Sequence, residues 1–151
     1  KEYLKVVSRD DLMANLPALR EKAGDRAVLR AIHFITEPER VRKLAAEVKE
    51  HDYTNFEKAV TDSGLSSWRF LQNCATPDPK HQGIALFLAM NEIYFQNHKG
   101  VCRVHGGGFA GSILSVIPKE ESPAFRAFLK DVLKNEYYEI HMRDAGSVKV
   151  F

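Results

Sequence analysis

A run of glycines that follows a basic residue is the part of this 151-residue sequence best suited to bind or hold a reacting group. The run comprises Gly106, Gly107, Gly108, Phe109, Ala110 and Gly111. Apolar segments at 101–105 and 112–117 flank it and are typical of strands. Glycine allows positive φ angles and close approach of the backbone, and successive exposed N–H groups can bind an anion. Taken alone, the pattern equally fits a tight loop that only connects two strands.

A second informative segment, Arg30–Val41, precedes the glycines by a long interval and shows helical spacing of charged residues. Together the two segments resemble signature motifs of galactokinases, which are sugar kinases of the GHMP family. The glycine run, which is preceded by a basic residue and followed by a buried strand, resembles the third signature motif. The upstream segment is similar to the galactokinase helix Arg-Ala-Arg-His-Val-Val-Thr-Glu-Asn-Glu-Arg-Val, with matches at Arg30, Ala31, His33, Thr36, Glu37, Glu39, Arg40 and Val41.

The resemblance covers essentially the whole chain and implies a fold and an activity. The implied fold is the ferredoxin-like α+β domain that forms the C-terminal half of GHMP kinases, here spanning 1–151. It would have an antiparallel sheet, helices packed on one face and an additional N-terminal helical segment. Galactokinases transfer the γ-phosphate of ATP to the anomeric hydroxyl of galactose with Mg²⁺, largely by positioning and charge stabilisation.

In the family, the sugar-binding motif, the phosphate loop and the catalytic Asp and Arg lie in the first half, and none of these motifs occurs in this sequence. The chain also begins at Lys1 without a methionine. We therefore expect a truncated or processed product that is inactive alone, binds neither ATP nor Mg²⁺ by itself, and contains no catalytic or metal-ligating residue. Its expected partners are the N-terminal half, ATP and a monosaccharide, and the fragment is expected to self-associate. Residues 106–111 would form a loop beside the phosphates.

Two departures from the family pattern leave the sugar open. Galactokinases carry Asn-Glu-Ser-His with a nearby Ser-Leu-Arg where this chain reads Thr-Asp-Ser-Gly-Leu-Ser-Ser-Trp at 61–68. A Pro-Glu-Leu-Asp segment is replaced by Pro-Asp-Pro-Lys at 77–80. The departures indicate a divergent galactokinase-like subgroup.

A noncatalytic α+β module, regulatory or sensing a small molecule, is the alternative, because ferredoxin-like folds host many functions. A kinase half requires a phosphate loop of the type Pro-x-Gly-x-Gly-Leu-Ser-Ser-Ser upstream, whereas a sensor module does not.

Several polar residues outside the glycine run have both a structural and a functional interpretation. His105 fits a hydrogen-bonding residue at a strand end better than a general base, because no partner acid is identifiable. The helical spacing of Arg30, His33, Glu37 and Arg40 predicts an ion-pair network that fixes helix packing. The segment 66–68 could meet a sugar through Trp68, although an N-cap followed by core residues is the commoner meaning.

Asp78 and His81 lack a third metal ligand, which favours a solvated loop. Cys74 and Cys102 have no companions at zinc spacing and are predicted to be reduced thiols.

The elements that must position these residues follow from periodicity and from helix-start and helix-stop signals. We predict a helical segment from Ser8 to Gly24 that is interrupted at Pro17, and a helix up to Ile35. A second helix, capped by Thr36 and Glu39 and kinked near Pro38, would extend to Glu50. The remaining predictions are helices at 52–63, 82–98 and 122–133, strands at 101–105 and 112–117, and an antiparallel pair at 138–142 and 148–150.

Composition excludes several classes of partner. The net charge is +2, from 22 basic and 20 acidic residues, so no basic footprint for nucleic acid or a membrane surface stands out. The longest apolar run, Ile84–Met90, is far shorter than the roughly 20 residues of a membrane-spanning helix. A cytoplasmic protein is expected.

Overall fold

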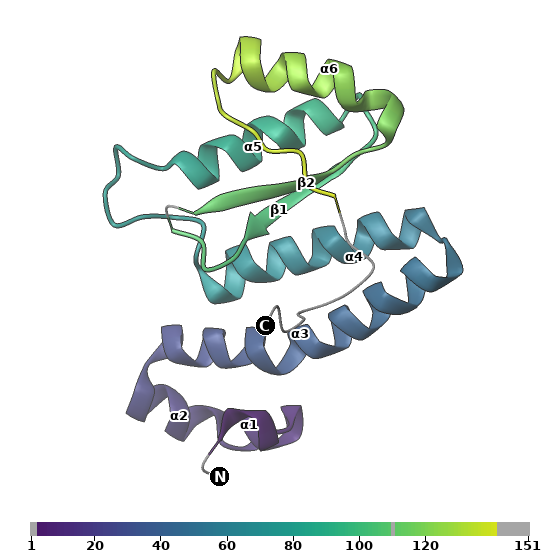
Figure 1. Ribbon diagram of the computed structural model, residues 1–151. Helices are drawn as coiled ribbons and strands as arrows, with labels where there is room; N and C mark the ends of the chain where they lie inside the picture. The colour runs from purple at the N-terminus through teal and green to yellow at the C-terminus, as the bar shows by residue number, and fades with distance from the viewer. Residues whose placement is uncertain (1–2, 110, 142–151) are drawn as a thin grey trace, which may run out of the picture. The chain divides into compact units, whose positions relative to one another are not determined.

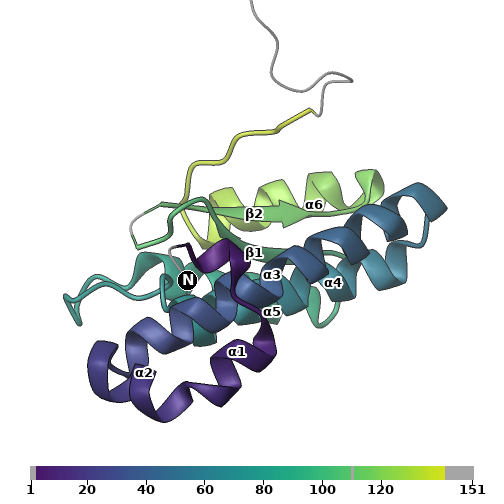
Figure 2. The ribbon, with the colours of Figure 1, turned by 90° about the horizontal axis from the view of Figure 1, so that it is seen from below.

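A computed structural model describes residues 3–109 and 111–141 and shows an α+β protein, which confirms the predicted class. The chain divides into two compact units, residues 1–118 and 119–151. The first unit contains the helices α1 to α5 and the strands β1 and β2, and the second contains α6 (Figures 1 and 2). No helix within the described residues is long and apolar enough to cross a membrane.

The first unit begins with two short helices, α1 (Arg9–Ala14) and α2 (Leu16–Ala23). Ser8 caps α1 in a reciprocal capping box with Asp11, in which the Asp11 N–H donates to the Ser8 hydroxyl over 3.1 Å. Pro17 lies in the first turn of α2, where its missing N–H costs nothing. Gly24 ends α2 with a φ of 81°. The predicted interruption and both end signals are confirmed.

The third helix, α3, is continuous over Asp25–Glu50, so the prediction of two helices on either side of Pro38 is wrong. The predicted cap also fails, because the Thr36 hydroxyl donates to the Ile32 carbonyl over 2.8 Å inside the helix. A proline inside a helix costs about 3 kcal/mol. The packing of α3 against α2 and α4 supplies the tertiary contacts that hold the helix together despite this cost.

Helix α4 (Tyr53–Ser66) begins at the N-cap Asp52, whose carboxylate accepts the Asn55 N–H over 3.1 Å. The predicted helix ends at residue 63, but the observed helix passes through Gly64 and the chain continues into a π-helical segment, Ser67–Leu71. A Cβ placed on Gly64 would lie 3.1 Å from the Arg103 Cβ, so this glycine allows α4 to approach β1 closely. α4 lies between α3 and β1 (Figure 1).

Helix α5 (Gly83–Phe95) and strands β1 (Val101–His105) and β2 (Ser112–Val116) complete the first unit, as predicted within a few residues. The strands are antiparallel, with Val101 opposite Val116 and His105 opposite Ser112. The core of this unit is a cluster of five buried side chains from α5, β1 and the preceding loop: Cys74, Ile84, Leu88, Cys102 and Val104. Both cysteines are free thiols, as predicted.

The second unit contains α6 (Ser122–Ala127), which passes directly into a π-helical segment, Phe128–Val132, so the predicted helix is confirmed. The predicted strand at 138–142 is wrong over the described positions 138–141, which form neither helix nor strand. Tyr138 is 87% exposed, and no strand pairs with this segment among the described residues. Alternating apolar residues form a strand only where a neighbouring strand accepts their hydrogen bonds. The predicted strand at 148–150 lies outside the described residues.

Candidate functional site

The glycine run forms the loop between β1 and β2, and three of its residues have left-handed backbone conformations. The φ angles are 68° at Gly106, 77° at Gly108 and 60° at Phe109. Gly107 does not have a positive φ, so its lack of a side chain is not required by backbone strain. Ala110 lies outside the described residues. The Gly111 N–H donates to the Gly108 carbonyl over 3.0 Å and closes the turn.

Asn73, which follows the π-helical segment after α4, holds this loop in place. Its carbonyl accepts the Phe109 N–H over 2.5 Å, and its side-chain amide donates to the Gly107 carbonyl over 3.3 Å. A Cβ on Gly108 would lie 2.2 Å from the Asn73 carbonyl oxygen, a separation that real contacts do not allow. Asn73 is 2% exposed, so its bonds to the loop are shielded from water. Sequence reasoning missed this residue, because nothing local distinguishes a buried asparagine from a loop asparagine.

Part of the loop is open to solvent, and several of its backbone donors have no partner among the described residues. Gly106 and Gly107 are exposed, and a Cβ on either would meet no atom within 4 Å. Within residues 3–109 and 111–141, the N–H groups of Gly106, Gly107 and Gly108 donate to no other group. Adjacent backbone donors without internal partners can bind an anion such as a phosphate. The loop is therefore anchored on one side and available to a ligand on the other.

His105 is exposed at the end of β1, opposite Ser112. Its side chain makes neither an ion pair nor a hydrogen bond with any described residue, so the predicted side-chain hydrogen bond at the strand end is not found. No carboxylate there orients its ring for a general-base role.

A second polar cluster is centred on Glu37 of α3, whose side chain is 19% exposed. Its carboxylate accepts the Arg40 Nε over 2.7 Å and the Ser63 hydroxyl, and lies 3.7 Å from the Arg103 Nη1. Arg103 also donates to the Ser63 hydroxyl. Burial alone would raise the pKa of the Glu37 carboxyl, but the hydrogen bonds from Ser63 and Arg40 and the charge of Arg40 outweigh it and lower the pKa.

The same cluster includes His33, whose Nδ1 lies 3.0 Å from the Ser66 hydroxyl. Arg40 donates to that hydroxyl over 2.6 Å. Burial lowers the pKa of His33. The negative charge of Glu37 acts to raise this pKa, whereas the positive charges of Arg40 and Arg103 lower it further.

The predicted network of helix charges is thus only partly confirmed. His33, Glu37 and Arg40 belong to it, whereas Arg30 instead donates to the Leu71 carbonyl over 3.4 Å. Arg103, from a strand far along the chain, was missed. The only feature of the sequence that could have indicated its role is its position in a predicted strand between apolar residues.

The other candidate residues have structural positions. Ser66 occupies the N-cap position of the π-helical segment, as predicted, but makes no side-chain cap hydrogen bond. Ser66 and Ser67 are buried and bond to the polar cluster, and Trp68 is 41% exposed rather than in the core. Asp78 and His81 form an exposed pair with 2.5 Å between Oδ2 and Nδ1, and the hydrogen bond from His81 lowers the pKa of Asp78. The described residues contain no group of three His, Cys, Asp or Glu side chains that could hold a metal ion.

Arg103 brings together the two segments that carry the sequence resemblance. It belongs to β1, which leads directly into the glycine loop, and it contacts Glu37 of the upstream segment. No family model matches the chain, and no curated protein matches it.

Proposed function

We propose that this chain is the C-terminal domain of an ATP-dependent sugar kinase similar to galactokinases, with the ferredoxin-like fold of that family. The complete enzyme would phosphorylate the anomeric hydroxyl of galactose or a related sugar. The observation that carries the proposal is the loop at 106–111, in which the N–H groups of Gly106 and Gly107 have no partner among the described residues while Asn73 anchors Gly107 and Phe109. Backbone N–H groups suit phosphate oxygens because they donate without competing for protons.

The Glu37–Arg103 contact supports the same proposal. Phosphoryl transfer depends on positioning to within fractions of an ångström, so a phosphate-proximal loop needs rigid supports. Arg103 ties the strand before the loop to α3 and α4, and Asn73 ties the loop itself. Both motifs of the resemblance therefore contribute to holding one loop.

The described residues supply one wall of such a site. They supply N–H donors for a phosphate, and no group of three His, Cys, Asp or Glu side chains that could hold a metal ion is found among them. We assign the Mg²⁺ ligands, the sugar contacts and the catalytic groups to the N-terminal half. Residues 1–151 alone are then expected to show no sugar-dependent ATP turnover and to associate with that half when the two are mixed, because interfaces within a chain bury roughly 600–1,500 Å².

The test uses the gene product that includes the segment upstream of Lys1. Turnover of ATP is measured with galactose and a panel of monosaccharides, for the wild type and for Gly107→Val. The valine side chain would occupy the open space above the loop, so we expect turnover to fall at least about tenfold while the melting temperature stays unchanged. Gly83→Val, at an equally open glycine in the first turn of α5, is the matched control and should leave the kinetics unchanged.

The outcomes separate the hypotheses. Absence of turnover with every sugar would refute the kinase and favour the noncatalytic module. Sugar-dependent turnover that Gly107→Val does not reduce would keep the kinase but refute the role of the loop.

A further inference from the structure

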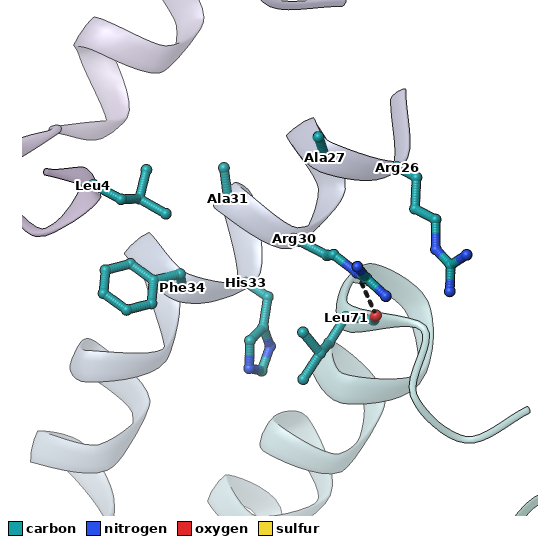
Figure 3. Close-up of a pocket in the computed structure, with 8 residues that line it drawn as sticks. All are labelled: Leu4, Arg26, Ala27, Arg30, Ala31, His33, Phe34 and Leu71. Atoms are coloured by element: carbon teal, nitrogen blue, oxygen red, sulfur yellow. Dashed lines mark hydrogen bonds between the residues drawn. The ribbon is translucent and has the colours of Figure 1, made fainter. Parts of the chain in front are cut away.

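A groove of about 660 Å³ lies on the first unit, away from the glycine loop. Helix α3 forms its main wall, with one residue from the N-terminal turn and one from the π-helical segment. The lining residues are Leu4, Arg26, Ala27, Arg30, Ala31, His33, Phe34 and Leu71 (Figure 3). Its volume is within the range of sites that bind small molecules.

The groove has an apolar side and a cationic side. Leu4 and Phe34 face each other at one side, whereas the side chains of Arg26 and Arg30 extend to the other (Figure 3). Ala27 and Ala31 lie between them, and their small side chains leave the space open. Phe34 is 48% exposed, which leaves much of an aromatic ring without a protein partner.

Neither arginine has an acidic partner in the part of the chain that the structure describes. The Arg26 side chain makes no ion pair or hydrogen bond within residues 3–109 and 111–141, and the only hydrogen bond of the Arg30 side chain there is the one it donates to the Leu71 carbonyl over 3.4 Å. The nearest acidic neighbour in sequence, Asp25, is engaged by Arg20 over 2.7 Å. Five other arginines each contact a carboxylate: Arg9, Arg20, Arg40, Arg103 and Arg126. The groove therefore has two positive charges that no described side chain neutralises.

We propose that this groove binds a small anionic molecule with a flat apolar body. Arg26 and Arg30 would contact its carboxylate or phosphate, because the planar guanidinium group donates paired hydrogen bonds to such anions. The apolar body would lie over Ala27 and Ala31 and cover the exposed ring of Phe34. Arg30, Ala31 and His33 also belong to the segment that resembles galactokinases. The proposal nevertheless does not depend on the kinase assignment, because it rests on the charge and shape of the groove alone and no residue of the groove belongs to the glycine loop.

The test measures binding to the 151-residue chain at low ionic strength by titration calorimetry and by amide NMR shifts. The probes are phenyl phosphate and benzoate, which distinguish binding of a phosphate from binding of a carboxylate. Two comparison probes each lack one feature: inorganic phosphate has no apolar body, and benzyl alcohol has no charge. We expect at least one aromatic anion to bind saturably and to shift the amides of Ala27 and Ala31. Both comparison probes should bind roughly tenfold more weakly.

Variants locate the site. Arg26→Gln combined with Arg30→Gln should weaken aromatic anion binding at least about tenfold, and Phe34→Ala should weaken it while leaving phosphate unaffected. Arg42→Gln, on the exposed surface of the same helix and outside the groove, should leave affinity unchanged. The proposal is wrong if neither aromatic anion binds saturably at millimolar concentration, if inorganic phosphate binds as well as the aromatic anions, or if Arg42→Gln weakens binding as much as the double variant.

Discussion

The Arg103 guanidinium lies 3.7 Å from the Glu37 carboxylate and so connects strand β1 with helix α3, although 66 positions separate the two residues in the sequence (103 − 37). Both side chains are about one-fifth to one-quarter exposed, at 27% and 19%. An ion pair in this environment is screened less by water than a surface pair. Removing one partner leaves the other charge partly buried and uncompensated.

Replacement of Glu37 by Gln should therefore destabilise the domain. The change removes the charge that Arg40 and Arg103 face, and we expect the free energy of unfolding to fall by about 2 kcal/mol. Urea denaturation at pH 7 measures this difference. Glu21→Gln, at an exposed position of α2, is the matched control and should change stability by less than about 0.5 kcal/mol. Equal stability of Glu37→Gln and the wild type would show that the cluster contributes no net stabilisation.

The stability of the wild type should also decrease in acid because of Glu37. Its pKa is lower in the folded protein than the ordinary value of 4.5, so between the two values the unfolded chain binds more protons. The contribution is complete above pH 4.5 and is lost as the pH falls toward the folded-state pKa. Denaturation experiments between pH 7 and pH 3 should show a smaller decrease in the free energy of unfolding for Glu37→Gln than for the wild type. If the free energy of unfolding falls equally with pH in both proteins, the lowered pKa is contradicted.

The free energy of unfolding should also decrease because of His33 as the pH falls, starting at a higher pH than the decrease caused by Glu37. Burial lowers its pKa below 6.5 in the folded protein, so the unfolded chain takes up the proton first as the pH falls. Its contribution is complete above pH 6.5 and is lost as the pH decreases from there toward the folded-state value. An NMR titration of the His33 ring should give a midpoint below 6.5, while a midpoint above 6.5 would mean that the charge of Glu37 outweighs burial.

Replacement by alanine should destabilise the domain at Gly108 but not at the neighbouring Gly107. Gly108→Ala introduces a Cβ at a φ of 77° and 2.2 Å from the Asn73 carbonyl, so we expect a loss of about 2 kcal/mol or more. Gly107→Ala enters open space without a positive φ and should change stability by less than about 0.5 kcal/mol. Thermal denaturation of both variants measures the contrast. Comparable losses at the two positions would contradict the docking of the loop on Asn73.

The two thiols should be unreactive in the folded protein. Burial, with the charge of Glu92, raises the pKa of Cys102 to about 12, and burial also raises the pKa of Cys74. Thiolate is the reactive form, so a disulfide reagent at pH 8 should label neither residue until urea unfolds the chain. Rapid labelling of one thiol per chain under native conditions would show that the buried cluster opens readily.

The sequence by itself was sufficient where a signal is local. The Ser8 cap, the break at Pro17, the stop at Gly24 and the two strands around the glycine run each depend on a few adjacent residues. Backbone geometry and nearby hydrogen bonds decide such features, and neither requires distant contacts.

Only the tertiary structure decided the features in which distant segments meet. Pro38 and Gly64 carry strong local stop signals, yet α3 and α4 pass through both because packing outweighs the local cost. The partnership of Asn73 with the loop and that of Arg103 with Glu37 have no local signature, because each forms when separate elements pack together. The sequence indicates the glycine run that could bind a phosphate. The side chains that hold this run in position, those of Asn73 and Arg103, are determined by the tertiary structure.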